Sequence, residues 1–211
     1  MLALTLVGSG ATVILGFVIV VLLISWFSNP PFGLGNAPAQ PVAFPHSVHV
    51  AQNGIQCEFC HRNVTKGAAA TVPAVEQCLF CHKNIEGTTA SARQEIAKFR
   101  VNADAGQAIQ LINWERVHRL PDHVRFVHEA HIRALTAMDV SARSSAEKVQ
   151  RACSICHGDI ANATVVKPKR FQSMKMGTCL DCHRFLTLAR DDGYAVPELT
   201  DIPTDCTVCH K

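Results

Sequence analysis

The hydrophobic side chains of this chain are concentrated at its beginning. Residues 2–27 include no charged side chain, and the first charged position of the sequence is Glu58. At a rise of about 1.5 Å per residue, a helix over this stretch crosses the hydrocarbon core of a bilayer even when tilted. The pattern predicts one transmembrane anchor helix over residues 1–28. Small residues at Gly8, Gly10 and Gly16 would let this helix pack closely against another one.

A cleaved secretory signal is the alternative for the same segment. Ala37, Pro38 and Ala39 resemble a small-residue cleavage site. The missing basic n-region and the length of the apolar run favour an anchor instead. Residues 29–45 are rich in Pro, Gly and Ala and carry no charge, which predicts an extended connector after the anchor.

Beyond the connector, the polar and apolar positions predict only short elements. Helix-forming residues occupy 91–114, with an interruption at Gly106 and a break at Pro121. Ser144 and Glu147 form a capping-box pattern, which predicts a short helix that leads to Cys153. Alternating strand patterns are almost absent. We therefore expect short α-helices and loops rather than a large packed core.

All ten cysteines belong to five copies of Cys-x-x-Cys-His, numbered here as the first to fifth motifs. The motif cysteines are Cys57, Cys60, Cys78, Cys81, Cys153, Cys156, Cys179, Cys182, Cys206 and Cys209, and the motif histidines are His61, His82, His157, His183 and His210. This spacing is the attachment signature of c-type haem. Each cysteine forms a thioether bond to the porphyrin, and the histidine binds iron as the proximal ligand. The sequence predicts five haem c groups in a multihaem cytochrome c, with the chain wrapped around them.

Other uses of paired cysteines explain this pattern less well. A zinc site takes four ligands from two Cys-x-x-Cys pairs, so five pairs leave one over, and zinc gives no reason for the histidines. A disulfide framework also ignores those histidines, and thioredoxin-like redox motifs occur singly. The haem interpretation accounts for every cysteine and for the residue that follows each pair.

An internal repeat organises the haem-binding region. The stretch from Phe44 to His49 reads Phe-x-His-x-x-His, and Phe126 to His131 repeats it. Each copy is followed by two of the motifs, and the fifth motif comes last. We expect a first di-haem module at 46–90, linking helices with one distal ligand at 91–125, and a second di-haem module with the C-terminal fifth haem at 126–211.

Six histidines outside the motifs are candidates for the distal side of five irons. His46, His49, His128 and His131 form the two His-x-x-His pairs, and three-residue spacing puts both members of a pair on one side of a helical turn. The remaining distal ligand is His118 or His123, with Met174 and Met176 as competitors. Methionine ligation would raise the reduction potential of that haem.

Enough ligands exist to bind every iron on both sides. A haem that activates a substrate needs an open coordination position, so saturated irons only pass electrons. The net charge of +3 and the aromatic content of 6% give no support for nucleic-acid binding, because Lys and Arg are scattered along the chain.

From Trp114 to His131, the chain resembles the Trp-x-x-Val-His-x-Leu-Pro-Asp-x-Val-x-Phe-x-His-x-x-His block of one family. This family is the pentahaem cytochrome c subunit of bacterial alternative complex III, a quinol:electron-acceptor oxidoreductase. The resemblance extends over nearly the whole chain, from the membrane helix to the fifth motif. It implies that His118 is a distal ligand, and that His123, at a usually aromatic position, lies at the surface or beside a ligand. Arg125 departs from the family, which commonly has a tyrosine there.

The resemblance also implies partners and a location. The expected partners are polytopic quinone-binding membrane subunits, a large periplasmic iron–sulfur subunit and a monohaem cytochrome c subunit or soluble acceptor. Haem is attached on the outer face of the bacterial cytoplasmic membrane. We therefore expect a single-pass protein of that inner membrane, with its N-terminus inside and its haem domain in the periplasm.

The resulting functional hypothesis is an electron-transfer subunit that relays electrons from quinol to a periplasmic acceptor such as cytochrome c or a high-potential iron–sulfur protein. The chain is not expected to be catalytic alone. One alternative is a stand-alone, membrane-anchored quinol dehydrogenase that feeds a periplasmic reductase. The absence of a methionine just after His61 and the presence of a fifth motif disfavour it. A structural or electron-storage protein without a quinol partner is the third possibility.

Overall fold

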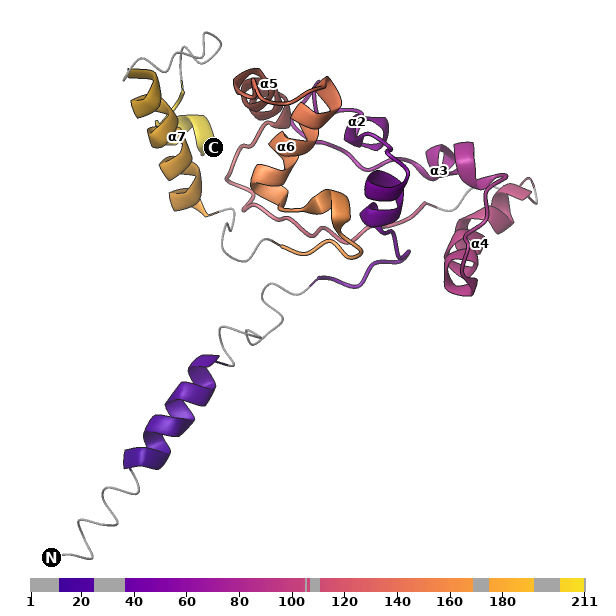
Figure 1. The fold of residues 1–211 in the computed structure, drawn as a ribbon, viewed down its shortest axis with the longest axis horizontal. Helices are drawn as coiled ribbons and strands as arrows, with labels where there is room; N and C mark the ends of the chain where they lie inside the picture. Colours follow the sequence, from indigo (N-terminus) through magenta and orange to yellow (C-terminus); the bar gives the residue numbers. More distant parts are fainter. Residues whose placement is uncertain are drawn as a thin grey trace, which may run out of the picture. The chain divides into compact units, whose positions relative to one another are not determined.

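The computed structural model describes residues 12–24, 37–104, 106, 111–168, 175–191 and 202–210. The chain divides into two units, Met1–Asn36 and Ala37–Lys211. In the first unit, residues 12–24 form a helix (Figure 1), and the residues of this helix are exposed to solvent. Among the described helices, none has both the length and the apolar character needed to span a bilayer. The rest of the predicted anchor, including Gly8 and Gly10, and residues 29–36 of the predicted connector lie outside the described residues.

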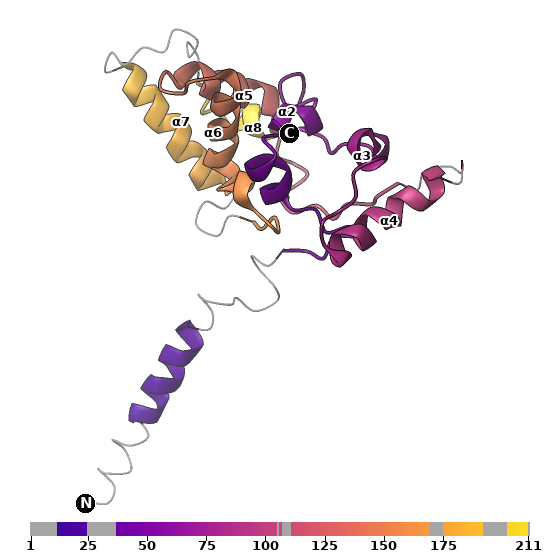
Figure 2. The same cartoon turned by 45° about the vertical axis from the view of Figure 1, so that its right-hand side comes forward.

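The second unit is built from short helices and loops, as the sequence predicts (Figures 1 and 2). Its elements are η2 (Ser47–Gln52), α2 (Cys57–Cys60), α3 (Val75–His82), α4 (Ala90–Asp104), α5 (His128–Met138), α6 (Ser145–His157), η3 (Ile160–Asn162), α7 (Met176–Asp191) and α8 (Cys206–Cys209). In the described ranges, β-pairing is limited to an isolated antiparallel bridge between Val124 and His210.

The start of α6 confirms the predicted capping box. The Ser144 side chain accepts a hydrogen bond from the backbone N–H of Glu147 at 3.2 Å. The Glu147 carboxylate in turn accepts from the N–H of Arg143 at 2.8 Å, one residue earlier than in the usual reciprocal arrangement. The first of these bonds satisfies an amide group that the first helical turn leaves free. The helix then runs to His157, so it delivers the whole third motif.

Helix α4 begins after a capping threonine and ends just before a glycine. Thr89 accepts a hydrogen bond from the N–H of Ala92 at 3.1 Å, which caps the first turn. The helix ends at Asp104, just before Gly106, whose φ of +67° is accessible to glycine with little strain. The predicted interruption near Gly106 is therefore confirmed. The predicted helical content beyond it is not, because residues 111–125 contain no helix, and α4 is the one helix in the described part of the 91–125 segment.

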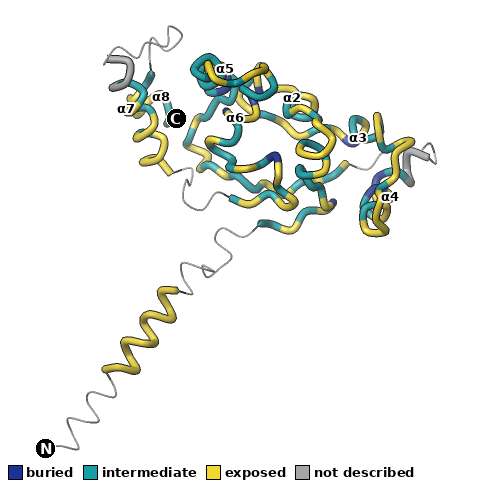
Figure 3. Tube along the Cα trace, in the orientation of Figure 1, coloured by how far each residue is buried: buried dark blue, intermediate teal, exposed yellow. Residues whose placement is uncertain are grey.

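The described part of the second unit has little buried hydrophobic surface (Figure 3). One small cluster joins Val64, Ile132 and Ala152, and Cys153 packs against it. A second cluster lies where α3 packs against α4, and Cys78 packs against it; its buried members are Val75, Ile96 and Phe99. Each cluster therefore fixes a cysteine of a predicted haem motif.

The two sequence repeats dock on one another reciprocally. The N–H of Ser47, next to His46, donates to the carbonyl of Ala163 at 3.0 Å. The N–H of Glu129, next to His128, donates to the carbonyl of Gly67 at 3.2 Å. Each acceptor lies six positions beyond a motif histidine, from 157 to 163 and from 61 to 67. The His-x-x-His segment of each repeat thus rests on the loop that follows the first motif of the other.

Candidate functional site

Each Cys-x-x-Cys-His motif adopts a helical turn. α2 and α8 consist of the four residues from the first motif cysteine to the second, with the motif histidine as the C-cap. α3 and α6 end on their motif histidines, and α7 carries the fourth motif inside it. Two cysteines three positions apart on a helical turn face the same side. This arrangement presents both sulfurs of a motif to one planar group.

The cysteines and their neighbours suit a porphyrin better than a bare metal ion. None of the ten cysteines forms a disulfide bond. Within the described residues, no three His, Cys, Asp or Glu side chains converge in the way a metal ion alone would require. In four motifs the residue before the second cysteine is a large apolar side chain exposed to solvent. These side chains are Phe59, Phe80, Ile155 and Val208. The motifs therefore combine thiols with apolar surface, as attachment to a hydrophobic macrocycle needs.

Backbone carbonyls orient six of the predicted ligand histidines through their Nδ1 atoms. The pairs are His49 with Pro45 (2.9 Å), His61 with Thr71 (2.5 Å), His82 with Ile85 (3.0 Å), His128 with Ala68 (2.7 Å), His131 with Val127 (2.8 Å) and His183 with Pro203 (2.6 Å). A carbonyl oxygen only accepts, so Nδ1 carries the proton in each case. A neutral ring then keeps its Nε2 lone pair free. This is the arrangement by which proteins hold a histidine for a metal.

Two proximal histidines face distal candidates at the spacing that one iron requires. The ring centroids of His49 and His82 are 6.0 Å apart, and those of His131 and His183 are 6.1 Å apart. Two metal–imidazole bonds of about 2 Å, on opposite sides of one iron, put ring centroids about 6 Å apart. The second and fourth motifs therefore fit a haem held from both sides by histidine.

The repeat extends to the geometry of the distal segments. Phe44 stacks on His49 with ring centroids 4.2 Å apart, and Phe126 stacks on His131 at 4.3 Å. The same phenylalanines meet the first histidine of each pair edge to face, at 5.1 Å and 4.9 Å. Each phenylalanine thus restricts the rotation of both rings, which holds the two histidines in fixed directions.

Burial makes the surroundings of His46 and His118 unfavourable for a charge. Burial lowers the pKa of His46 to about 4, with smaller contributions from the nearby His61 and His49. Burial also lowers the pKa of His118, and His128 adds to that shift. Within the described part of the chain, Nδ1 of His46 and Nε2 of His118 are buried without a hydrogen-bond partner. Leaving such a nitrogen unpaired costs about 1–3 kcal/mol. A metal bond to Nε2 of His118 would relieve that cost at His118.

The geometry also places His118 and His128 near the third motif. The ring of His118 stacks on that of the motif histidine His157, with centroids 4.4 Å apart. His128 lies near enough to His118 to influence its pKa. Burial lowers the pKa of His131 as well, although its hydrogen bond to the Val127 carbonyl opposes the shift. Metal ligation needs neutral imidazole, so these shifts favour the form that binds iron.

His123 lies beside the fifth motif. Its ring stacks on that of His210, with centroids 5.4 Å apart and an angle of 20° between the planes. The N–H of Arg125 donates to the carbonyl of Cys209 at 2.7 Å, next to the bridge between Val124 and His210. The sequence offers His123 as an alternative distal ligand to His118, and the family resemblance places it at the surface or beside a ligand because that position is usually aromatic. No local pattern links His123 to a motif that begins 83 positions further along the chain.

Of the two methionine candidates, the structure describes only Met176. Met176 begins α7, and 64% of its surface is exposed. It lies on the same helix as Cys179, three positions before it. Met174 lies outside the described residues.

Thiols of two modules touch one another. Cys57 of the first motif lies close enough to Cys153 of the third for the two thiols to interact, which lowers the pKa of Cys57 to about 7 and raises that of Cys153. The two shifts are opposite because the pair shares one proton. Helices α2 and α6, which carry these cysteines, pack against each other. The attachment points of the first and third motifs are therefore neighbours, although 96 positions separate them in the sequence.

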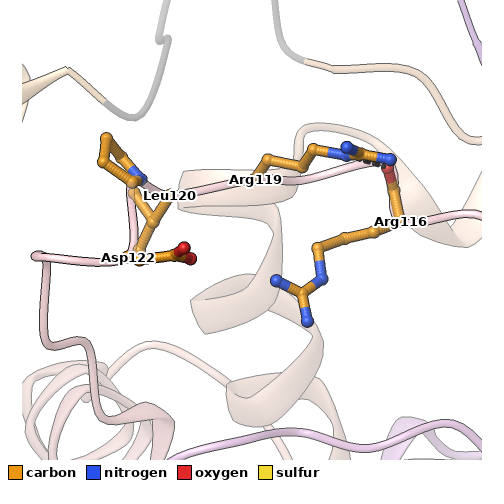
Figure 4. A pocket seen from close by; sticks show the side chains of 5 residues that line it. Arg116, Arg119, Leu120 and Asp122 are labelled. Carbon is orange, nitrogen blue, oxygen red and sulfur yellow. Dashed lines mark hydrogen bonds between the residues drawn. The ribbon is translucent and has the colours of Figure 1, made fainter.

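A shallow pocket of about 440 Å³ lies along the stretch between His118 and His123 (Figure 4). Arg116, Arg119, Leu120, Pro121 and Asp122 line it. Arg119 also pairs with Glu115 at 3.7 Å. Guanidinium groups bind carboxylates well, so this lining suits the ionised propionates of a porphyrin.

Comparison with known proteins finds a similar multihaem cytochrome c subunit. It is 28% identical, over 213 aligned positions, to the multihaem cytochrome c subunit of menaquinone reductase from Nitratidesulfovibrio vulgaris. The alignment covers 97% of this chain and 91% of that subunit. No family model matches the chain. The similarity supports a multihaem cytochrome c with covalently bound c-type haem, and it does not reach the more specific resemblance to alternative complex III.

Proposed function

We propose that this chain is the electron-transfer subunit of a membrane quinone oxidoreductase complex and carries five haem c groups. The carrying observation is the pairing of His49 with His82 and of His131 with His183 at about 6 Å, with each Nδ1 held by a carbonyl. Bound haem would supply reversible one-electron exchange between ferric and ferrous iron. The similarity to a multihaem subunit of a quinone-linked complex supports the same role.

The chain's own residues would position and insulate the haems. Carbonyl groups fix the tautomer of the ligand histidines, and Phe44 and Phe126 fix their direction. Burial keeps His46, His118 and His131 neutral and ready to bind iron. Ligands on both sides leave no coordination position for a substrate. We therefore assign electron transfer to the chain, and the quinone chemistry to partner subunits.

The direction of electron flow has two candidates. The block from Trp114 to His131 favours quinol oxidation, as in alternative complex III, with electrons leaving to a periplasmic cytochrome c or high-potential iron–sulfur protein. The relative from Nitratidesulfovibrio vulgaris belongs to a menaquinone reductase, and that name favours electron delivery to quinone. Both assign the chain the same part, a relay between a membrane quinone site and a periplasmic electron carrier.

We further propose that residues 1–28 anchor the chain in the bacterial cytoplasmic membrane, with the haem-binding unit in the periplasm. The uncharged apolar run supports this placement. Polytopic quinone-binding subunits, a periplasmic iron–sulfur subunit and a monohaem cytochrome c are the partners that this arrangement suits. A stand-alone quinol dehydrogenase would need none of them.

Gentle detergent purification, followed by subunit identification, tests the proposal. We expect the chain to co-purify with polytopic membrane subunits, and mass spectrometry of the separated chain to show five covalent haem adducts. A redox titration followed by absorbance should show all five haems as low-spin. Isolation of the chain alone, with a high-spin haem that binds added ligands, would contradict electron transfer and favour an enzymatic role.

A further inference from the structure

The distribution of histidines around the motifs leaves one iron to be assigned. His46 lies near His61, His49 faces His82, His131 faces His183, and His118 stacks on His157. Three motif histidines thus have a distal candidate whose ring centroid lies within 6.1 Å, and His46 lies within electrostatic range of a fourth, His61. His128, the sixth candidate, has no iron in this assignment. The fifth motif has one as well, His123, which the sequence offers only as an alternative to His118. We propose that His123 is the distal ligand of the haem attached to Cys206 and Cys209, an inference that rests on the proposed function.

The ring geometry of this pair supports the assignment. The centroids of His123 and His210 are 5.4 Å apart, compared with 6.0 Å for His49 and His82 and 6.1 Å for His131 and His183. A change of less than about 1 Å brings the pair to the spacing of two imidazoles on one iron. The His118 and His157 rings, at 4.4 Å, depart further from that spacing.

Backbone pairing holds the two rings together. The residue after His123 forms the bridge with His210, and Arg125 donates its N–H to the carbonyl of Cys209. The N–H of Val124 donates to the carbonyl of Pro121 at 2.9 Å, so a turn precedes the bridge. Three hydrogen-bonded features within five residues therefore fix the position of His123 relative to the fifth motif.

Two competing ligands that the structure describes, His118 and Met176, lie elsewhere. His118 precedes the Pro121 turn and stacks on the histidine of the third motif. Met176 lies on the helix that carries the fourth motif. His123 is exposed, whereas the other ten histidines are half-buried. Its site is therefore open to small molecules in solution, which makes chemical rescue a practical test.

The test replaces His123 in the full-length chain within its membrane complex. In the ferric state, His123→Ala should convert one of the five haems from low-spin to high-spin, as measured by electron paramagnetic resonance and absorbance. Added imidazole should restore the low-spin state, because it can enter the exposed position and bind the iron. If every haem of His123→Ala stays low-spin, His123 does not bind iron and the proposal is wrong.

A four-haem background identifies which haem is affected. Replacing Cys206 and Cys209 by alanine removes the fifth attachment site. In that background, His123→Ala should create no high-spin haem, and a high-spin signal that persists would overturn the proposal. His118→Ala is the matched control, since any high-spin signal that it produces should survive the loss of the fifth motif.

A second variant covers the case in which His123→Ala does not assemble. His123→Met supplies another axial ligand, so all haems should stay low-spin while one reduction potential rises. Unchanged potentials for all haems would contradict ligation by His123. The haem count of the unaltered chain, from mass spectrometry, tests the proposed function separately.

Discussion

Uncharged backbone carbonyl groups orient individual histidine side chains. The Nδ1 atoms of His49 and His131 donate to the carbonyls of Pro45 and Val127, four residues before each of them. These local bonds form wherever the backbone turns at the Phe-x-His-x-x-His sequence. The direction of Nε2, and hence the ability to bind iron, is therefore built into each repeat.

At this scale we expect His49→Ala to leave one haem without its distal ligand. One of five haems should become high-spin in the ferric state, because alanine offers no donor atom to the iron. Spin quantitation by electron paramagnetic resonance measures the change. Gln52→Ala, an exposed change on the same η2 element, is the control and should leave every haem low-spin. A fully low-spin His49→Ala protein would refute ligation by His49.

Individual helices carry the motifs, and their caps determine how firmly the motifs are held. The Ser144 cap of α6 and the Gly158 residue after its end, with φ of +72°, confine the helix to the stretch that delivers Cys153 and His157. The side chain of Glu95 links α4 to the segment that precedes His46, through the N–H of Ala43 at 2.9 Å. The Ser144 cap and the Glu95 link each use a side-chain oxygen to accept a hydrogen bond from a backbone N–H.

Removal of the α6 cap should weaken the chain measurably. Ser144→Ala leaves the N–H of Glu147 without its partner, and the expected loss is about 1 kcal/mol of unfolding free energy. Denaturant unfolding followed by circular dichroism measures the difference. Ser145→Ala, one residue inside the helix, is a matched control that keeps the cap. Equal midpoints for the two variants would show that the cap contributes nothing.

The Glu95 link should depend on pH. Hydrogen bonds from Lys98 and from the N–H of Ala43 lower the pKa of Glu95 in the folded chain. A lowered folded-state pKa contributes stability above the unfolded pKa, and this contribution is lost as the pH falls through the folded value. Glu95→Gln should thus destabilise the chain at neutral pH, by less than about 1 kcal/mol because the pair is near solvent.

Unfolding midpoints of the unaltered chain and of Glu95→Gln, measured over a series of pH values, check this dependence. The difference should vanish at a pH below the lowered pKa of Glu95. Glu76→Gln, an exposed change on α3, gives the comparison for simple loss of one surface charge. A difference that grows on acidification would have the wrong sign for the proposed link.

At the scale of the haem-binding unit, reciprocal contacts hold the two repeats together. Each His-x-x-His segment docks on a loop of the other repeat, and Cys57 contacts Cys153 between them. The buried cluster of Val64, Ile132 and Ala152 contains residues from both repeats. Because the described part has few buried residues, this small cluster has a large share in the contact between modules.

Truncation within that cluster should therefore be costly. Ile132→Ala removes buried methyl groups between the repeats, and we expect a loss of about 2–5 kcal/mol. Denaturant titration, followed by the haem absorbance of the assembled protein, provides the measurement. Val140→Ala, at a side chain that is 91% exposed, should change the midpoint little. A similar loss for both variants would show that the cluster is not the contact on which the modules depend.

The sequence alone determined the local features of this protein. Thioether attachment needs two thiols and a histidine within one helical turn, so Cys-x-x-Cys-His specifies its chemistry without reference to the rest of the chain. The repeat, the α6 cap and the helix break at Gly106 are likewise local patterns. Each depends on residues a few positions apart, whose geometry the backbone fixes directly.

Only the tertiary structure decided which histidines meet. His49 pairs with His82, and His123 pairs with His210, across distances in sequence that no periodic pattern spans. Those pairings depend on hydrogen bonds between loops, such as that from Arg125 to Cys209. A loop hydrogen bond uses backbone groups that every residue possesses, so its partner leaves no mark in the sequence. The residues alone therefore predict the haem chemistry, whereas proposing which distal histidine serves which motif requires the fold.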